Sequence, residues 1–318
     1  MSEVESSRAD LSGAQQALLN DLARAYLAQH RRERRWRWVW RLFWLGVAAS
    51  MVWGAMSNMP SATAPVTPHT ALVEVRGEIA SDAEANADNL MTALRSAFED
   101  QGARAVVLRV NSPGGSPVQA GLVNDEILRL KALHKKKVYA VCEEMCASAA
   151  YYIAVAADQI YVDKASMVGS IGVLMDGFGF TGVMDKFGVE RRLMTAGENK
   201  AMLDPYSPRN PQHEAYAQAM LDQIHKQFID VVKTGRGKRL KDDPTTFTGL
   251  FWNGQQAVNL GLADHLGSLD GVARDVVKAE EVIDYTQKSN LAERLAKRFG
   301  AAIGDGAVRA LRSMSVVR

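Results

Sequence analysis

The chain has 318 residues, of which 47% are apolar, and its 38 Lys and Arg residues nearly balance 36 Asp and Glu residues to give a formal net charge of +2. This length and apolar content suffice for one or two domains with a substantial core. A charge so close to zero excludes a general nucleic-acid-binding surface, so we expect no nucleic-acid partner.

Near the N-terminus, basic residues precede a long apolar stretch. Six arginines fall within residues 31–41, and Leu42–Met59 is a run of 18 residues without a charge. With the residues just before it, the run is long enough to cross a bilayer as a helix, and tryptophans lie near both of its ends. The arginines predict a cytoplasmic N-terminus. We therefore expect a cytoplasmic segment over 1–37, a transmembrane helix over 38–59 and a Pro-containing linker over 60–70.

Two other interpretations of this stretch stay open. A buried core helix is disfavoured because so many arginines would lie beside the core. A cleaved secretory signal peptide would have a charged region of roughly 40 residues, far longer than usual, although Ala62-Thr63-Ala64 would serve as a cleavage site.

From residue 71 onward, β-like and helical segments alternate. The expected strands cover 71–76, 104–110, 137–142 and 159–163. The expected helices cover 87–100, 118–133, 148–156 and 211–233, with two more within 255–280. This order predicts a parallel sheet covered by helices on both faces, with its site at strand-to-helix corners. We place the domain at 71–280 and a basic amphipathic tail at 281–318.

Two of these corners carry groups suited to acyl transfer. Asn111–Pro117 contains Gly114-Gly115 and offers backbone N–H groups, and Ala147–Tyr152 places Ser148 among small residues. Together they predict an oxyanion hole and a nucleophile. We expect Asn111 to shape the turn and to have no direct chemical role.

A serine nucleophile needs a base, and the sequence offers two kinds. Five histidines follow the apolar run, His69, His134, His213, His225 and His265, and none lies in a motif with an acid partner. Lys200 follows a β-like run over 189–194 and has small and apolar residues after it. A lysine must be neutral to accept a proton, which predicts higher activity above neutral pH. An ordinary loop lysine is the alternative.

Cys142 and Cys146 are the two cysteines of the chain. An exported domain permits a disulfide, but the sequence leaves open whether a pair with this spacing at a strand end can be bridged. Two ligands are too few for a zinc site, so we expect no metal. We expect both cysteines to be small buried side chains near the active corner. The alternative is that Cys146 is reactive.

In these motifs the chain resembles the signal peptide peptidase A family, membrane-anchored bacterial serine proteases of the Clp protease/crotonase fold. The resemblance runs from about Ala71 to Asp270. Its further motifs are Gly169-Ser170-Ile171-Gly172-Val173, Gly197-x-x-Lys200, Ser207-Pro208, Trp252-x-Gly254-x-Gln256-Ala257 and Leu260-Gly261-Leu262-Ala263-Asp264.

The resemblance implies an α/β fold of repeated β-β-α units with flanking helices. It also implies roles for individual residues: Ser148 as nucleophile, Lys200 as general base, Gly114 and Ala149 as oxyanion-hole donors, and Ser170 as the residue that orients the lysine. One departure is Ala149-Ala150, where the family usually has Gly-Gly. Alanine reduces backbone freedom there and makes a positive φ costly.

The resemblance further implies a homo-oligomeric ring, with eight subunits expected, in which the lysine of one protomer serves the serine of its neighbour. The expected location is the bacterial inner membrane with the catalytic domain on the periplasmic side. The expected substrates are cleaved signal peptides or other short, unfolded chains, and no cofactor is implied. The alternatives are a non-catalytic membrane scaffold of the same fold and, less favoured, a crotonase-type acyl-CoA enzyme.

Overall fold

The computed structural model describes residues 38, 40–51 and 67–287, and the chain divides into two compact units, 1–65 and 66–318. In the first unit, residues 40–51 are helical. Among the described residues, no helix has both the length and the apolar content needed to cross a bilayer. The predicted cytoplasmic segment, the second part of the predicted span (52–59) and the tail beyond 287 lie outside the described residues.

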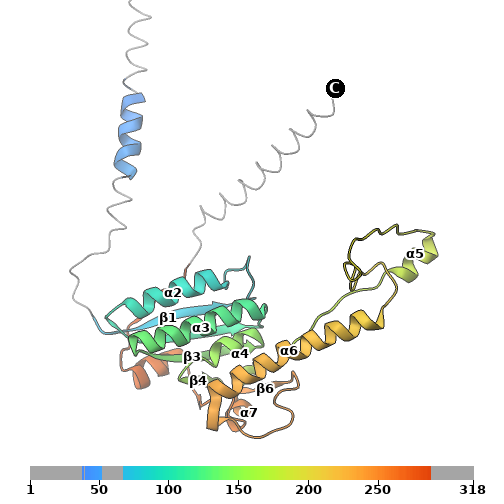
Figure 1. Ribbon diagram of the computed structural model, residues 1–318. Coiled ribbons are helices and arrows are strands. Elements are labelled where there is room, and N and C mark those ends of the chain that lie inside the picture. Colours follow the sequence, from blue (N-terminus) through green and yellow to red (C-terminus); the bar gives the residue numbers. More distant parts are fainter. Residues whose placement is uncertain (1–37, 39, 52–66, 288–318) are drawn as a thin grey trace, which may run out of the picture. The chain divides into compact units, whose positions relative to one another are not determined.

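Within residues 67–287, the second unit is built on an eight-stranded sheet in which only the β5–β6 pair is antiparallel. The strands are β1 (His69–Arg76), β2 (Ala103–Ser112), β3 (Lys137–Ala147), β4 (Gln159–Val162), β5 (Met167–Gly169), β6 (Phe251–Asn253), β7 (His265–Leu266) and β8 (Val282–Asp284). The parallel α/β sheet predicted from the alternation of strands and helices is thereby confirmed (Figure 1).

The long strand β3 is shared between two partners. Its first part, Tyr139–Cys142, pairs with β4, and its last part, Met145–Ala147, pairs with β5. The sheet therefore splits within β3, between Cys142 and Met145, and Ser148 follows the part of β3 that pairs with β5.

Helices cover both faces of the sheet. They are α2 (Ala87–Glu99), α3 (Pro117–His134), α4 (Ala149–Ala154), α5 (Thr181–Phe187), α6 (Pro211–Arg236), α7 (Gly254–Asn259) and α8 (Leu269–Gly271), with short turns η1 (Gly237–Arg239) and η2 (Val272–Val277). The main core lies between the sheet and α2, α3 and α4. A smaller cluster on the other face joins Val107, Val141 and Tyr161 to Val272 of η2.

The helix starts follow local capping chemistry. Ser116 caps α3 and accepts from the Gln119 N–H, and Pro117 takes the first turn, where a missing N–H is harmless. Asn210 and Pro211 do the same for α6. These signals explain why the predicted helices over 118–133 and 211–233 are confirmed.

The borders of the domain differ from the prediction at both ends. His69, placed in the linker, is the first residue of β1 and is buried, with its Nε2 3.0 Å from the Tyr285 hydroxyl. At the other end β8 pairs with β1, so the sheet continues past residue 280 into the expected tail. Both differences arise from pairing between distant segments.

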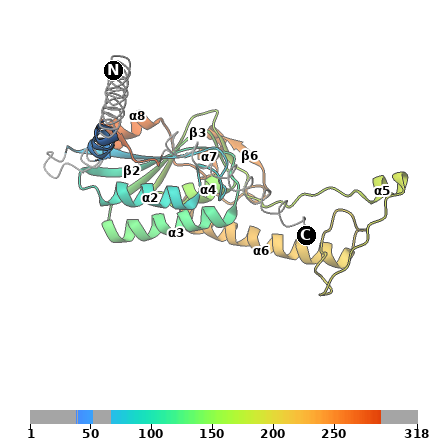
Figure 2. The ribbon, with the colours of Figure 1, turned by 90° about the horizontal axis from the view of Figure 1, so that it is seen from above.

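Residues 173–210, here called the arm, leave the sheet after β5 and end at the start of α6, which leads the chain back to the sheet (Figure 1). Figures 1 and 2 show the arm, which carries α5, projecting past the sheet along the N-terminal half of α6. The β-like run over 189–194 forms no strand: these residues are exposed and pair with no strand of the described chain.

Candidate active site

Ser148 occupies the corner between β3 and α4. Its backbone has φ +53° and ψ −123°, a conformation that is costly for any residue with a Cβ. Two hydrogen bonds hold it there: the Ser148 N–H donates to the Gly169 carbonyl at 2.8 Å, and the Ser148 carbonyl accepts from the Tyr152 N–H at 3.0 Å. A strained serine at a strand-to-helix turn is the geometry that presents a nucleophile.

The short helix behind Ser148 is fixed by buried polar contacts. The Tyr151 hydroxyl donates to the Leu262 carbonyl at 2.7 Å, and the Asn124 side chain donates to the Tyr152 carbonyl at 2.8 Å. Burial raises the pKa of Tyr151, so its hydroxyl stays protonated as a donor. Hydrogen bonds to α3 and to the loop after α7 therefore hold the corner in place.

The glycine pair lies directly against this corner. Gly114 has φ +104°, and a Cβ built there would lie 2.7 Å from the Ser148 Cβ and 2.9 Å from the Ala149 nitrogen. Gly115 has φ +142°, and a Cβ there would lie 2.2 Å from the Ile79 carbonyl oxygen. Only glycine permits this approach, so the predicted proximity of the two corners is confirmed.

The N–H groups at the corner differ in what they bond. The Gly114 N–H donates to the buried Ser112 hydroxyl at 3.1 Å. Ala149 is the first residue of α4, where helix geometry leaves the N–H without an intrahelical acceptor. An oxyanion at Ser148 would therefore find the Ala149 N–H already available, whereas the Gly114 N–H would have to turn away from Ser112.

The departure from Gly-Gly after the serine has a structural account. Positive φ falls on Ser148, and Ala149 and Ala150 lie in the regular turn of α4. Both alanines are buried, so their methyl groups fill the core beneath the corner.

Ser170 lies next to the corner, one residue after the carbonyl that accepts from Ser148. It also has a positive φ, of 50°, and its N–H donates to the Leu250 carbonyl at 2.8 Å. Its neighbour Gly169 packs against the Trp252 ring, which leaves no room for a Cβ.

Lys200 is on the arm, exposed, with its N–H donating to the Gly197 carbonyl at 3.1 Å. The described contacts of the arm link it to itself and to α6; Arg191 pairs with Asp204 at 3.0 Å, and Asn199 contacts His213 at 3.2 Å. Within the described chain, Ser148, Gly114, Ala149 and Ser170 come together, and no described contact brings Lys200 or a histidine to Ser148.

Three residues that build the corner were not predicted from the sequence: Ser112, Gly169 and Ile79. Ser112 and Gly169 belong to sequence motifs named above, but roles in the site were assigned only to their neighbours in those motifs. Ile79 carries no local signal, because it reaches Gly114 and Gly115 through backbone bonds only.

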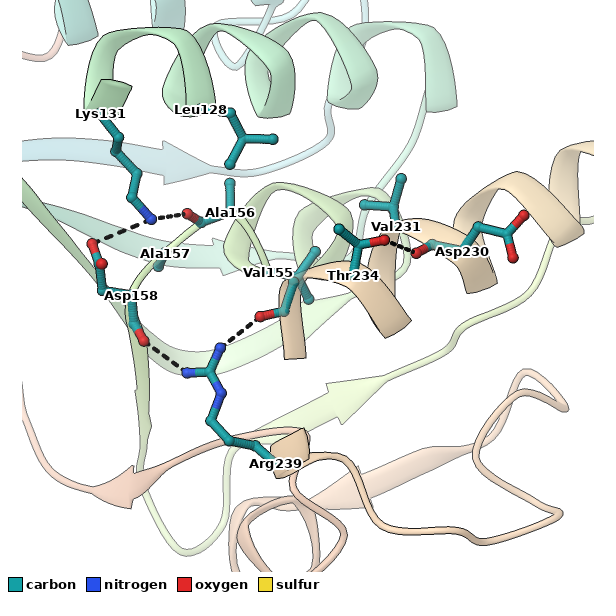
Figure 3. A pocket seen from close by; sticks show the side chains of 11 residues that line it. Leu128, Lys131, Val155, Ala156, Ala157, Asp158, Asp230, Val231, Thr234 and Arg239 are labelled. Atoms are coloured by element: carbon teal, nitrogen blue, oxygen red, sulfur yellow. Dashed lines mark hydrogen bonds and ion pairs between the residues drawn. The ribbon is translucent and has the colours of Figure 1, made fainter. Parts of the chain in front are cut away.

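A hollow of about 610 Å³ between α3, the loop after α4 and the end of α6 lies apart from these residues. Figure 3 shows Lys131 and Arg239 reaching into it, and both are engaged: Lys131 donates to the Ala156 carbonyl at 2.8 Å, and Arg239 to the Asp158 carbonyl at 2.7 Å. Among the described residues, no group of three or more His, Cys, Asp or Glu side chains is placed to hold a metal ion.

The fold and the corner define a parallel α/β protein that presents a strained serine beside glycine backbone. The family model "Peptidase family S49" matches residues 131–283, which include Ser148, Ser170 and Lys200. The chain belongs to this family of peptidases, and the expected relationship to signal peptide peptidase A is confirmed.

Three relatives illustrate the range of similarity. "Putative protease slr0021" of Synechocystis is 31% identical over 62% of this chain and 69% of its own length. "Putative signal peptide peptidase SppA" of Enterococcus faecium is 28% identical over 67% of this chain and 64% of its own. "Na(+)/H(+) antiporter NhaA" of Brucella melitensis is 47% identical over 55% of this chain but only 24% of its own length, so most of that protein lies outside the match.

Proposed function

We propose that the chain is a serine endopeptidase in which Ser148 attacks the scissile carbonyl. The observation that carries the proposal is the positive φ of Ser148 beside a glycine backbone that leaves no room for a side chain. Attack forms a bond from Ser148 Oγ to the carbonyl carbon and moves negative charge onto the carbonyl oxygen. The Ala149 N–H, joined by the Gly114 N–H once it leaves Ser112, stabilises that charge.

Lys200 is the proposed general base. As a neutral amine it takes the Ser148 hydroxyl proton and returns it to the leaving amine, which leaves an acyl-enzyme that water then hydrolyses. Lys200 lies on a projecting arm without a described contact to Ser148. We therefore propose that the lysine serves the serine of a neighbouring protomer in a homo-oligomeric ring, with eight subunits expected.

The proposed substrates are cleaved signal peptides or other short, unfolded chains, in keeping with the name of the Enterococcus relative. The proposed location is the periplasmic face of the inner membrane, with an anchor over 38–59. The uncharged run Leu42–Met59 behind six arginines supports the anchor. Retention in the membrane pellet after alkaline carbonate extraction, and accessibility of the domain to protease in spheroplasts, would test both.

The central test is hydrolysis of a fluorogenic apolar peptide by the full-length chain in detergent. We expect Ser148→Ala to lower kcat by about 10⁴–10⁶-fold and Lys200→Ala by at least about 10³-fold. Lys186→Ala, which removes another exposed arm lysine, is the matched control and should keep activity. Loss with Ser148→Ala alone would assign the base elsewhere. An inactive wild type with its oligomer intact would favour the scaffold.

Sharing of the site between protomers has its own test. Ser148→Ala and Lys200→Ala chains, each inactive, are co-expressed with different tags and purified through both. If sites are shared, a serine from one chain meets a lysine from the other, and part of the activity returns. Co-expression of Lys200→Ala with the double variant should restore nothing. No recovery in the first pair would place both residues of a site in one chain.

A further inference from the structure

Two buried thiols lie just ahead of the active corner. Cys142 and Cys146 are both on β3, at most 1% exposed, and belong to the same core cluster. Both are free thiols in this structure. The mechanism proposed above uses neither of them.

The two cysteines lie closer together in the fold than their separation of four residues in the sequence suggests. In a regular strand, residues four positions apart are separated by about 13 Å. A disulfide needs Cα atoms about 4.4–6.8 Å apart. A flat β3 would therefore keep the two cysteines out of reach of each other.

A bulge in β3 removes this obstacle. Cys142 pairs with Val110 of β2, and Cys146 pairs with Ser112, so four steps along β3 oppose two steps along β2. Two steps of a strand cover about 6.6 Å, which is within the range for a bridge. Val110 and Ser112 share one face of β2, so their partners share a face as well.

The bulge is held by specific contacts. The Ser166 hydroxyl lies 3.1 Å from the Cys142 carbonyl and also contacts the Glu143 carbonyl, and it accepts the Asp163 N–H at 2.9 Å. Beyond the bulge, Met145–Ala147 pair with β5. The short separation of the cysteines is thus built into the sheet.

The thiols also act on each other. Burial raises the pKa of Cys146 well above its ordinary value, and the hydrogen bond and charge of Cys142 raise it further. Buried thiols of this kind react slowly while the core is closed. A bridge would therefore form while β3 is open, during folding.

We propose that Cys142 and Cys146 form a disulfide that cross-links the β3 bulge, which directly precedes Ser148 in the chain. The oxidant is a small-molecule or protein disulfide. One cysteine thiolate attacks it, releases one thiol and gives a mixed disulfide, and the second thiolate displaces the other thiol. The two cysteines lose two electrons and two protons in total, and the oxidant becomes two thiols.

The test uses the reduced full-length chain in detergent, exposed to oxidised glutathione in enough urea to open the core and then returned to buffer. The protein is denatured, alkylated and cut with a glutamyl endopeptidase, which cleaves after Glu143 or Glu144, between the cysteines. We expect the two fragments to stay joined and to separate on reduction. Separate fragments that carry alkyl or glutathionyl groups would overturn the proposal.

Stability gives a second readout with a matched control. The oxidised wild type should have a higher Tm than the reduced wild type, because the cross-link restricts the unfolded chain. Cys142→Ala keeps one thiol, so its Tm should be the same after either treatment. A wild-type Tm that reduction leaves unchanged would overturn the cross-linking role.

Discussion

Ser148 carries the local backbone strain of the proposed site, and Gly114 lies directly against it. The backbone of Gly114 can lie against the serine only because it has no Cβ. Gly114→Ala should push the loop away from Ser148 and displace one oxyanion donor. We expect kcat for the fluorogenic peptide to fall by about 10²–10³-fold, measured on folded protein.

Gly121 of α3 is the matched glycine control. A Cβ there would meet nothing within 4 Å. Gly121→Ala should leave hydrolysis unchanged and stabilise the fold by about 0.5–1 kcal/mol, because alanine favours a helix interior. Equal losses in both glycine variants would show that the effect at Gly114 is not local to the site.

At the scale of elements, a buried ion pair ties the end of α6 to the loop after α7. Arg236, 1% exposed, donates to both carboxylate oxygens of Asp264 at 2.9 and 2.8 Å and to the Gly261 carbonyl at 2.8 Å. Burial favours a raised pKa at Asp264, but the hydrogen bonds and charge of Arg236, together with the Ile160 N–H and the charge of Arg239, outweigh it and the pKa is lowered. The pair fixes the base of the helix that supports the arm.

Removal of Arg236 should be costly, because the Asp264 carboxylate that it leaves behind is only 10% exposed. We expect Arg236→Ala to lower the free energy of unfolding by about 3–5 kcal/mol, measured by urea denaturation. Arg274→Ala breaks an Arg–Asp pair whose side chains are both more than half exposed, and it should leave the free energy of unfolding nearly unchanged. Similar costs would contradict the assignment of Arg236 as a buried anchor.

Helices α2 and α3 are joined by Glu126, which bonds Arg129 and Arg95, both at 2.6 Å. The hydrogen bond from Arg129 is the largest cause that lowers the pKa of Glu126, and the pKa falls from 4.5 to about 2 although burial opposes the change. A lowered pKa stabilises the fold above the unfolded value, and this stabilisation is lost as pH falls through the folded value.

Glu126→Gln should therefore lower Tm at pH 7, and the gap to wild type should close as pH falls from about 4.5 to about 2. Thermal melts across this range measure it. Glu99→Gln, at an exposed position on α2, is the control and should leave Tm unchanged. A gap that stays constant with pH would mean that Glu126 acts through packing alone.

At the scale of the whole molecule, the arm presents more apolar surface than a solvated loop normally does. Its large exposed side chains include Leu174 (81%), Phe178 (78%), Phe187 (79%) and Met194 (95%). Lys200 lies on the same segment. A neighbouring protomer of the proposed ring would cover this apolar surface, and the same interface would bring Lys200 to the Ser148 of that protomer.

Phe187→Glu should therefore shift the protein to smaller species in size-exclusion chromatography with light scattering, and activity should fall in parallel. Leu133→Glu changes an apolar side chain of α3 that is 64% exposed and off the arm, so it should alter neither property. An unchanged oligomer in Phe187→Glu would remove the arm from the proposed interface.

Much of the domain between residues 71 and 163 could be predicted from the sequence, because short apolar strands alternate with capped helices and each signal is local. The corner could also be predicted from the sequence. Gly114-Gly115 and a serine among alanines follow consecutive strands, and they lie close together because parallel strands bring their carboxyl ends to one edge of the sheet. The β-like run over 189–194 of the arm is not a strand in the structure, because β-like composition forms a strand only where a partner strand is available.

By itself, the sequence determined the family, the parallel sheet and the residues of the corner, since these follow from local periodicity and motifs. Only the tertiary structure decided that Ser148 itself carries the positive φ, that His69 and β8 belong to the sheet, and that the β3 bulge brings Cys142 near Cys146. Each depends on a partner far away in the chain: Gly169 for the serine, Tyr285 for the histidine, β1 for β8 and β2 for the bulge. Such pairings are fixed by packing and register, and no local pattern encodes them.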